Sequence, residues 1–190
     1  MPLYNTLASI NVLALTEKAP RSALMTENLS KFFRITLNSG REFISIKEEL
    51  EHLSSYLYIE KQRFGSRFDF QISSQPETES WITVRLLLQP LAENAVKHAF
   101  VGIKRKGLLT VSVKTEGNRI KYTVRDNGKG MQIGGIRDLL DREEAGYGLK
   151  YIDMRLKLYY KNDYTFHCVS VFGEGTVFTI DVPRLSEGGG

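Results

Sequence analysis

Three short segments of the sequence combine residue types that can bind a nucleotide. They are Gln89–His98 (QPLAENAVKH), Val124–Met131 (VRDNGKGM) and Gly146–Leu149 (GYGL). Taken singly, each has a plain structural explanation. An asparagine on an apolar helix can be a satisfied core amide, Asp-Asn-Gly is a favoured turn, and two glycines can let a loop enter a helix. The three together, in this order, predict a binding site.

The first two segments supply polar groups suited to a magnesium–nucleotide complex. The amide oxygen of Asn94 is a hard ligand that Mg²⁺ accepts alongside waters and substrate phosphates. Glu93 and Lys97 are four residues apart and share a helix face beside Asn94, and Lys97 can supply a point charge to the phosphates. Asp126 ends an expected strand, where its carboxylate can accept hydrogen bonds from an exocyclic amine such as that of adenine.

Glycines supply the room that the backbone needs around such a ligand. Gly128 and Gly130 remove side chains where the backbone must approach a planar base. Gly146 and Gly148 precede a helix, so that backbone amides and the helix dipole can face a triphosphate. A hydroxyl near the base could come from Thr176. The predicted nucleotide-binding residues are Asn94, Lys97, His98, Asp126, Gly128, Gly130, Gly146, Tyr147, Gly148, Leu149 and Thr176.

Hydrophobic periodicity predicts the elements that position these segments. The first third is helical over about 3–10 and 23–37, and Ser45 with Glu48 forms a capping box that starts a further helix ending near Gly65. The remainder alternates strands (68–72, 109–113, 120–124, 165–171, 176–182) with helices (86–100, 149–159), with a turn at 117–118. Residues 132–145 are polar and poorly periodic, which predicts a mobile loop that closes as a lid.

These elements predict an α+β protein in which a helical segment, residues 1–66, precedes a second domain of alternating strands and helices, residues 67–185, and a tail, 186–190. The helical segment has apolar faces, which it buries either on the second domain or on a second copy of the chain. Two such segments make a four-helix homodimer the natural expectation.

Composition narrows the classes of partner. Of the 190 residues, 42% are hydrophobic and 25% charged, which is ordinary for a soluble protein with a core. The net charge of +4 is scattered, so no nucleic-acid partner is expected. Cys168 is the single cysteine, which excludes a disulfide framework and favours a reducing, intracellular setting. No run reaches the length of a spanning helix, so any membrane part of a parent protein lies upstream of this chain.

The three segments resemble the asparagine box and the two glycine boxes of the GHKL superfamily, which includes DNA gyrase, the large heat-shock chaperones, histidine kinases and MutL. The match spans about residues 86–182. The resemblance implies that residues 67–185 form an α/β sandwich with a mixed sheet, which binds ATP and Mg²⁺ between its helices and a flexible lid.

The amino-terminal third resembles sensor histidine kinases of the LytS-like family. The segments that carry this are Leu3–Leu7 (LYNTL), Ile46–His52 (IKEELEH), Tyr56–Phe64 (YLYIEKQRF) and Leu86–Pro90 (LLLQP). The resemblance implies phosphoryl transfer from ATP to a histidine and then to an aspartate of a response-regulator receiver domain. It also implies a membrane-anchored parent whose cytoplasmic part includes this chain.

The family's phosphoacceptor histidine falls four residues before Asn5, at Met1, so this chain is expected to hold no phosphoacceptor and not to phosphorylate itself. None of its three histidines matches that motif. We expect His52 to be solvated on its helix and His167 to be structural in a strand. Two roles stay open for His98, which are contact with a phosphate and a packed or capping position.

One departure from the superfamily separates kinase from ATPase. Hydrolysing members place a water-activating glutamate four residues before the metal-binding asparagine, and here that position is Pro90. Glu93 points about 100° away from Asn94 on a helix of 3.6 residues per turn, and could serve as an acid–base or metal-orienting group. The sequence thus favours a kinase, with a non-catalytic nucleotide-sensing scaffold as the alternative and an ATPase clamp as a third.

Overall fold

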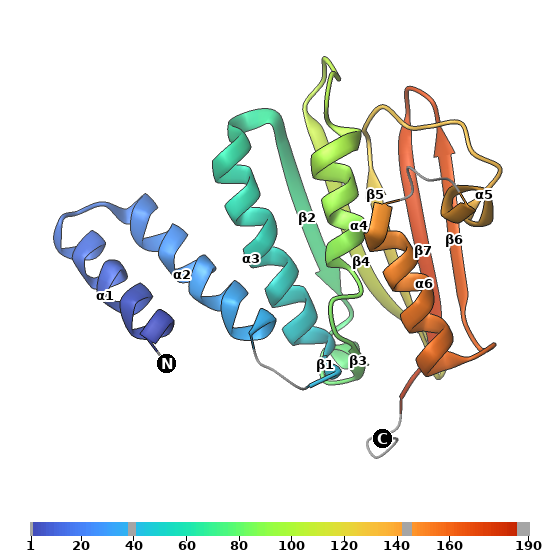
Figure 1. Ribbon diagram of the computed structural model, residues 1–190, viewed down its shortest axis with the longest axis horizontal. Helices are drawn as coiled ribbons and strands as arrows, with labels where there is room; N and C mark the ends of the chain where they lie inside the picture. Colours follow the sequence, from blue (N-terminus) through green and yellow to red (C-terminus); the bar gives the residue numbers. More distant parts are fainter. Residues whose placement is uncertain (1, 38–40, 142–145, 186–190) are drawn as a thin grey trace.

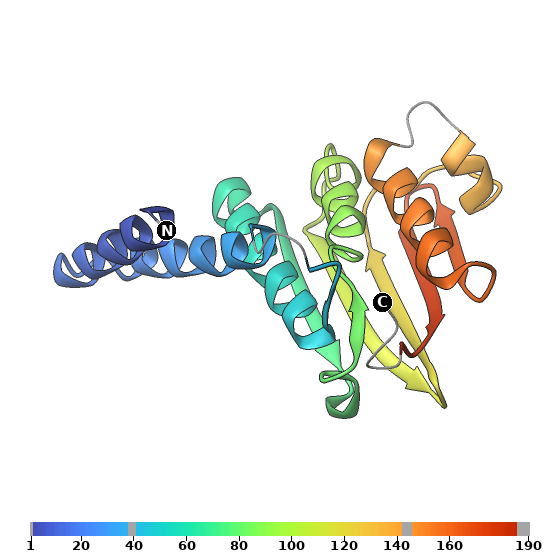
Figure 2. The ribbon, with the colours of Figure 1, turned by 60° about the horizontal axis from the view of Figure 1, so that its bottom comes forward.

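The computed structural model describes residues 2–37, 41–141 and 146–185, and it consists of a helical hairpin that projects from an α/β sandwich (Figure 1). Helix α1 (Pro2–Thr16) and helix α2 (Pro20–Thr36) form the hairpin. Across their interface Asn11 donates a hydrogen bond from Nδ2 to the carbonyl oxygen of Ala23, 2.7 Å away. Figure 2 shows this hairpin reaching away from the sheet. Large apolar side chains of α1 stay exposed, and they are Leu3, Ile10, Val12, Leu13 and Leu15.

Helix α3 (Ile46–Phe64) belongs to the sandwich by its packing. The predicted capping box is confirmed: the side chain of Ser45 accepts from the amide of Glu48, and the Glu48 carboxylate accepts from the Ser45 amide. The apolar face of the helix, which includes Leu53 and Leu57, is fully buried in the main hydrophobic core. Of the two alternatives for the helical third, α3 therefore buries its stripe on the sandwich.

The sheet is mixed, as predicted. Its strands are β2 (Phe68–Ser74), β4 (Gly107–Glu116), β5 (Arg119–Asp126), β6 (Thr165–Val171) and β7 (Gly175–Pro183), in the order β2-β4-β5-β7-β6. Only the β2–β4 pair of these is parallel. Side chains alternate along β4, where Leu109, Val111 and Val113 are buried, so one face of the strand packs on the core.

Three helices cover one face of this sheet: α3, α4 (Gln89–Asn94) and α6 (Gly146–Tyr160) (Figures 1 and 2). Apolar residues of α4 and α6, among them Leu91, Ile152 and Leu156, are fully buried against the buried side chains of the strands. The core thus lies between one helical layer and one sheet face. In the described residues 2–37, 41–141 and 146–185, no helix is long and apolar enough to cross a membrane.

Several elements differ from the sequence prediction. A two-stranded antiparallel sheet of β1 (Phe43–Ser45) and β3 (Ile82–Val84) was not predicted. Helix α4 begins at Gln89 rather than Leu86, because Leu86 has a φ of 59° in a turn. The buried carboxylate of Glu49 fixes that turn by accepting from the amides of Leu86 and Leu88, each at 2.8 Å.

The segment predicted as a mobile loop contains a helix, α5 (Ile136–Asp141), in which Leu139 is buried. Residues 142–145, the Asn38–Gly40 helix stop, Met1 and the tail lie outside the described residues. Two short 3-10 turns, η1 (Gly65–Arg67) and η2 (Pro76–Thr78), flank β2.

Helix α4 continues into a π-helical turn, η3 (Ala95–Ala99), in which the amide of Phe100 donates to the carbonyl of Ala95 at 3.1 Å. Such turns widen a helix locally and occur often at functional sites. Here it directly follows Asn94, the residue predicted to hold the metal.

Candidate functional site

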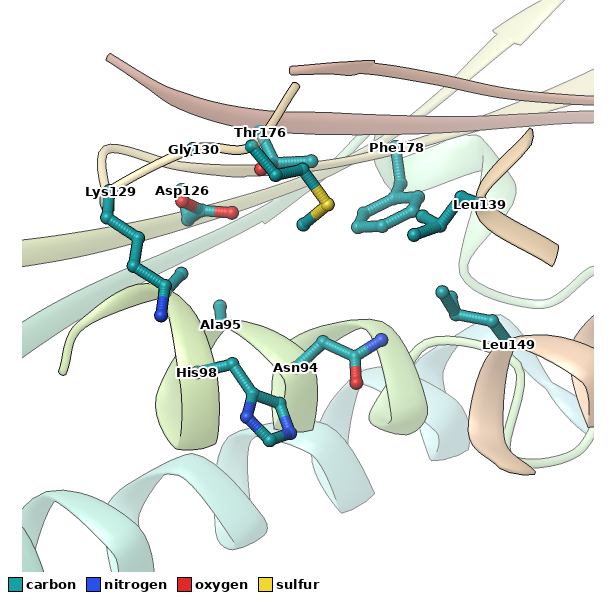
Figure 3. A pocket seen from close by; sticks show the side chains of 12 residues that line it. Asn94, Ala95, His98, Asp126, Lys129, Gly130, Leu139, Leu149, Thr176 and Phe178 are labelled. Atoms are coloured by element: carbon teal, nitrogen blue, oxygen red, sulfur yellow. The ribbon is translucent and has the colours of Figure 1, made fainter. Parts of the chain in front are cut away.

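A cavity of about 210 Å³ lies between the α4–η3 helix and the sheet. It brings together six of the predicted residues from segments far apart in the chain. These are Asn94, His98, Asp126, Gly130, Leu149 and Thr176. Figure 3 shows Asn94 and His98 on the helical side and Asp126 and Thr176 across from them. Six further residues complete the lining, namely Ala95, Ala99, Lys129, Met131, Leu139 and Phe178.

The lining is mostly apolar with a few polar groups, the composition typical of a small-ligand pocket. The sequence prediction missed this apolar part. The alternation of side chains along β7 indicates that Phe178 is buried, but it does not indicate that Phe178 lines a ligand cavity. Leu139 lies on α5, in the segment predicted to be a loop.

Asp126 is the buried polar group at the end of β5, with 6% of its surface exposed. Its Oδ1 accepts a hydrogen bond from the amide of Gly128 at 2.8 Å. Burial raises the pKa of the carboxyl, because desolvation disfavours the charged form. The backbone amides of Gly128 and Thr176 and the charge of Arg105 oppose that shift in pKa. The carboxylate is thus held in place on one side and can accept from a ligand on the other.

Thr176 lies beside Asp126 in the β5–β7 pairing and is buried. Its hydroxyl is 2.8 Å from the hydroxyl of Ser170, and the Ser170 hydroxyl also lies 2.9 Å from the amide of Met131, from which it accepts. These bonds tie the glycine turn to the β6–β7 hairpin. Ser170 was not singled out from the sequence, where a serine in a strand gives no signal.

The two glycines of the turn after Asp126 are required by contacts within the protein. A Cβ at Gly128 would lie 2.5 Å from the Cβ of Ala99, and Gly130 has a φ of 63° with the Val171 carbonyl oxygen where its Cβ would point. The room that both glycines were expected to make for a ligand base is thus taken up by other parts of the protein. Both glycines let the turn pack on the π-helical turn η3 and on β6, and Gly130 alone of the two lines the cavity.

Asn94 directly precedes the widened turn η3, His98 lies within this turn, and both residues line the cavity. Among the residues that the structure describes, the side-chain amide of Asn94 has no hydrogen-bond partner, so its oxygen is available to a ligand. His98 is an exposed residue of the cavity lining. Its side chain is therefore not packed in the core.

Glu93 and Lys97 pair with each other outside the cavity lining. The Lys97 ammonium is 2.9 Å from a Glu93 carboxylate oxygen, and the other oxygen accepts from Gln89 Nε2 at 2.8 Å. The structure therefore places the predicted phosphate-binding charge of Lys97 in an ion pair rather than in the pocket. The cation that lines the cavity is Lys129, from the second segment (Figure 3).

The third segment forms the first turn of α6, which begins at Gly146 rather than after the two glycines as predicted. Leu149 is buried and lines the cavity, whereas Tyr147 is 95% exposed and points away from the core. A Cβ at Gly148 would lie 3.0 Å from the Cβ of Pro90, so this glycine lets α6 approach the first turn of α4. Pro90 occupies the turn where a water-activating carboxylate would stand, and it offers no acid or base.

The expectation for His52 was wrong. The residue is fully buried between α2 and α3, where its ring stacks on Phe32 with centroids 4.7 Å apart and its Nε2 is 3.0 Å from the hydroxyl of Thr36. Burial lowers its pKa to about 4, with help from the charge of Arg85. His167 is exposed on β6.

The residues present fit a magnesium–nucleotide complex. No group of three or more His, Cys, Asp or Glu side chains that could hold a metal occurs in the described part of the chain. Magnesium does not need such a cage, since it keeps several waters and uses one or two protein oxygens together with substrate phosphates. One amide oxygen, from Asn94, at the cavity wall meets that requirement.

Family models match most of the chain. The histidine kinase model matches residues 3–68, and the model of the histidine kinase-, DNA gyrase B- and HSP90-like ATPases matches residues 79–186. Sensor histidine kinase YesM of Bacillus subtilis and BtsS of Escherichia coli K12 are each 31% identical over 97% of this chain. Sensor protein LytS of Bacillus cereus is 27% identical over 96% of it. The chain spans about a third (32%) of the length of each of these relatives.

Solved structures share the fold. Acinetobacter baumannii histidine kinase AdeS aligns with a TM-score of 0.58 at 14% identity, covering 97% of this chain and 96% of that one. ShkA in complex with AMPPNP aligns with a TM-score of 0.57 at 17% identity, covering 97% of this chain and 43% of that one. With its asparagine helix, its two glycine segments and its mixed sheet, the chain belongs to the family of histidine kinase-, DNA gyrase B- and HSP90-like ATPases, and its curated homologues are LytS-like sensor histidine kinases.

Proposed function

We propose that this chain is the ATP-binding catalytic portion of a two-component sensor histidine kinase. The observation that carries the proposal is the cavity in which Asn94, Asp126 and Thr176 meet from an asparagine helix, a strand end and a hairpin. Its volume, about 210 Å³, is below the range of roughly 300–1,000 Å³ typical for sites that enclose a drug-sized ligand. It therefore suits the adenine base, with the ribose and phosphates extending out of it.

Adenine binding follows from the polar groups at the sheet side of the cavity. The Asp126 carboxylate accepts from the exocyclic amine of adenine, while the Gly128 amide holds its Oδ1 at 2.8 Å. Ala95, Met131 and Phe178 supply apolar surface for the base. An ionised Asp126 is needed for this, because a protonated carboxyl would present a donor to the amine.

Phosphate binding follows from the helical side. Asn94 holds Mg²⁺ through its amide oxygen, and the ion neutralises phosphate charge when bound. The first residues of α6, Gly146 and Gly148, direct backbone amides at the phosphates. Lys129 adds a positive charge on the cavity wall, and Lys97 can join it if it leaves its ion pair with Glu93. Closure of the segment 132–145 excludes water.

The acceptor is a histidine of the kinase rather than water. Pro90 leaves the first turn of α4 without a general base, so hydrolysis lacks the group that would activate water. A neutral imidazole is already a nucleophile, and transfer to it depends mainly on positioning and charge neutralisation. We infer that the acceptor is none of the histidines here, because neither His98 nor the other two match the phosphoacceptor motif of the LytS-like family. His52 is buried against Phe32, and His167 lies on β6, away from the cavity lining.

The remaining partners belong to the same proposal. The exposed apolar side chains of α1, including Ile10 and Leu13, suit a four-helix homodimer. The phosphoryl group then passes to an aspartate of a response-regulator receiver domain. The parent protein is proposed to be a membrane-anchored sensor with this part in the cytoplasm.

Transfer from labelled ATP separates the three candidate functions. The test protein is a version of this chain that is extended upstream of Met1. It is incubated with γ-labelled ATP and Mg²⁺. Acid-labile label retained on the protein is the expected result, since phosphohistidine is lost in acid. Released phosphate without labelled protein would identify an ATPase, and neither product despite ATP binding would identify a nucleotide-sensing scaffold.

A further inference from the structure

The side chain of Arg105 holds the glycine turn from outside the cavity. It lies in the segment between η3 and β4 and lines a separate surface groove with Arg67, Lys104 and Lys106. Its Nε donates to the carbonyl oxygen of Asn127 at 2.9 Å, and its Nη2 lies 2.5 Å from the same oxygen. Nη2 also lies 2.8 Å from the Gly128 carbonyl and 2.7 Å from the Gly173 carbonyl. One guanidinium thus joins the turn after Asp126 to the β6–β7 turn.

The same turn makes further hydrogen bonds to β4 and the residue before it, to η3 and to the β6–β7 turn. The Asn127 side chain accepts from the amide of Leu108 at 2.7 Å and donates to the carbonyl of Lys106 at 3.2 Å. Lys129 donates from its amide to Ala99 at 2.9 Å and accepts from the amide of Gly173 at 2.7 Å. Arg105 is the charged side chain at the centre of these contacts, and its partners are carbonyl oxygens that a cation suits.

The turn that Arg105 holds carries the sheet-side wall of the pocket. Asp126 immediately precedes it, and Lys129, Gly130 and Met131 belong to it and line the cavity. A shift of the turn would move the carboxylate that accepts from the base. We propose that Arg105 is a positioning residue for the nucleotide, which fixes the turn that sets adenine recognition. This proposal rests on the proposed function, namely ATP binding in this cavity.

Arginine is suited to this position by its geometry. Its guanidinium presents several donors in a rigid planar fork, whereas a lysine ammonium is a compact charge with three rotatable donors. Arg105→Lys therefore keeps the charge but cannot reproduce the bonds to Asn127, Gly128 and Gly173 together. Comparing Arg105→Lys with Arg105→Ala separates the effect of the planar guanidinium donors from the effect of the positive charge.

The charge of Arg105 also acts on Asp126. It opposes the rise in the pKa of Asp126 that burial causes. The other titratable groups that face Asp126 are His98 and Lys129 at the cavity and Cys168 on β6. All three stay in place when Arg105 is replaced. A change in the pH dependence of ATP binding between variants then reports on Arg105.

The test measures ATP and GTP dissociation constants by calorimetry for the wild-type chain, Arg105→Ala, Arg105→Lys and Lys104→Ala. Lys104 is exposed in the same groove, and its replacement removes one charge without touching the turn. Guanine carries a carbonyl where adenine carries its amine, so the ATP-to-GTP ratio reports on the Asp126 contact. Circular dichroism at each pH gives the folded fraction, to which affinities are normalised.

We expect Arg105→Ala to weaken ATP binding by about tenfold, the scale of one charge-assisted hydrogen bond at an exposed site, and to reduce the ATP-to-GTP ratio. On acidification, the ATP affinity of Arg105→Ala should begin to fall at a higher pH than that of the wild type, because loss of the Arg105 charge raises the pKa of Asp126. Arg105→Lys should lose part of the preference for ATP over GTP while keeping the wild-type pH dependence of ATP binding. If Arg105→Ala does not fold, the result for Arg105→Lys alone tests the inference.

Two results would overturn the inference, and they differ from failure of the proposed function. If Arg105→Ala and Arg105→Lys match Lys104→Ala in affinity, ratio and pH dependence, Arg105 does not position the nucleotide. If only the melting temperature falls, its role is structural and the inference is wrong. A wild-type chain that binds no ATP would instead refute the proposed function.

Discussion

Replacement of His52 by phenylalanine should remove a large pH-dependent part of the stability of this protein. The His52 ring stacks on Phe32, with the two planes 18° apart, and its Nε2 is 3.0 Å from the Thr36 hydroxyl. That hydroxyl donates its hydrogen to the Phe32 carbonyl at 2.9 Å. Nε2 must therefore carry the hydrogen and donate to Thr36, which leaves Nδ1 as the site of protonation. Within the described residues, Nδ1 is buried without a hydrogen-bond partner.

The magnitude follows from the pKa. Burial, with the nearby charge of Arg85, lowers the pKa of His52 from 6.5 to about 4. Between these values the unfolded chain binds a proton that the native state does not, so stability is fully present above pH 6.5 and falls as the pH decreases toward 4. At about 1.4 kcal/mol for each pH unit, the whole window corresponds to roughly 3 kcal/mol in the free energy of unfolding.

The assay is urea denaturation of the wild-type chain, His52→Phe and His167→Phe over that pH window. Phenylalanine keeps a ring that can stack on Phe32 and cannot titrate. His167 is exposed on β6, so its replacement controls for the general effect of losing a histidine. Other groups titrate here too, including the buried Glu49, but they are present in all three proteins and cancel in the differences.

We expect the wild type and His167→Phe to lose roughly 3 kcal/mol more than His52→Phe on acidification. Equal losses in all three proteins would refute the reasoning. His52 would then titrate normally in the folded chain, and the packing of α2 on α3 would be looser than the structure shows.

Two further predictions concern the frame of the site. Gly130→Ala should destabilise the fold by several kcal/mol, on the order of 3, and abolish ATP binding, because its Cβ would overlap the Val171 carbonyl. Gly117→Ala has nearly the same φ, 64° against 63°, but open space, and by urea denaturation should cost only about 1 kcal/mol; equal costs would show that the overlap is relieved. Glu49→Gln should cost about 1–3 kcal/mol, because the Leu86 and Leu88 amides use different oxygens of Glu49 and a carboxamide offers only one acceptor oxygen. The exposed Glu51→Gln should be near neutral in the same assay, and a cost for Glu49→Gln no larger than this would contradict the role of Glu49.

Local signals in the sequence predicted the elements well. Ser45 and Glu48 predicted a helix start that depends only on four neighbouring residues. The turn at Gly117 predicted the β4–β5 hairpin, because glycine adopts the positive φ that such a turn needs, here 64°, without a steric cost. Asn94 and Asp126 were placed in one site because their segments matched a family pattern, and the cavity brings them together.

Features that depend on distant contacts were missed. The β1–β3 pair joins Phe43 to Val84, and three-residue strands are too short to give a periodic pattern. The late start of α4 depends on Glu49, 37 residues before Leu86. His52 was expected in solvent because the helix partner that covers it, α2, could not be placed by periodicity. The spacing of Glu93 and Lys97 indicated that the two residues share a helix face. It did not indicate whether Lys97 forms an ion pair with Glu93 or binds a ligand.

The central claim is that Asn94 binds the metal of a magnesium–ATP complex in this cavity. Calorimetric titration of ATP, with Mg²⁺ and then with a chelator, into the wild-type chain, Asn94→Ala and Asn28→Ala tests it most directly. Asn28 lies on α2, away from the cavity, and controls for the loss of a helical asparagine. The account predicts magnesium-dependent ATP binding in the wild type and in Asn28→Ala, and its loss in Asn94→Ala. Unchanged magnesium-dependent affinity in Asn94→Ala would contradict it.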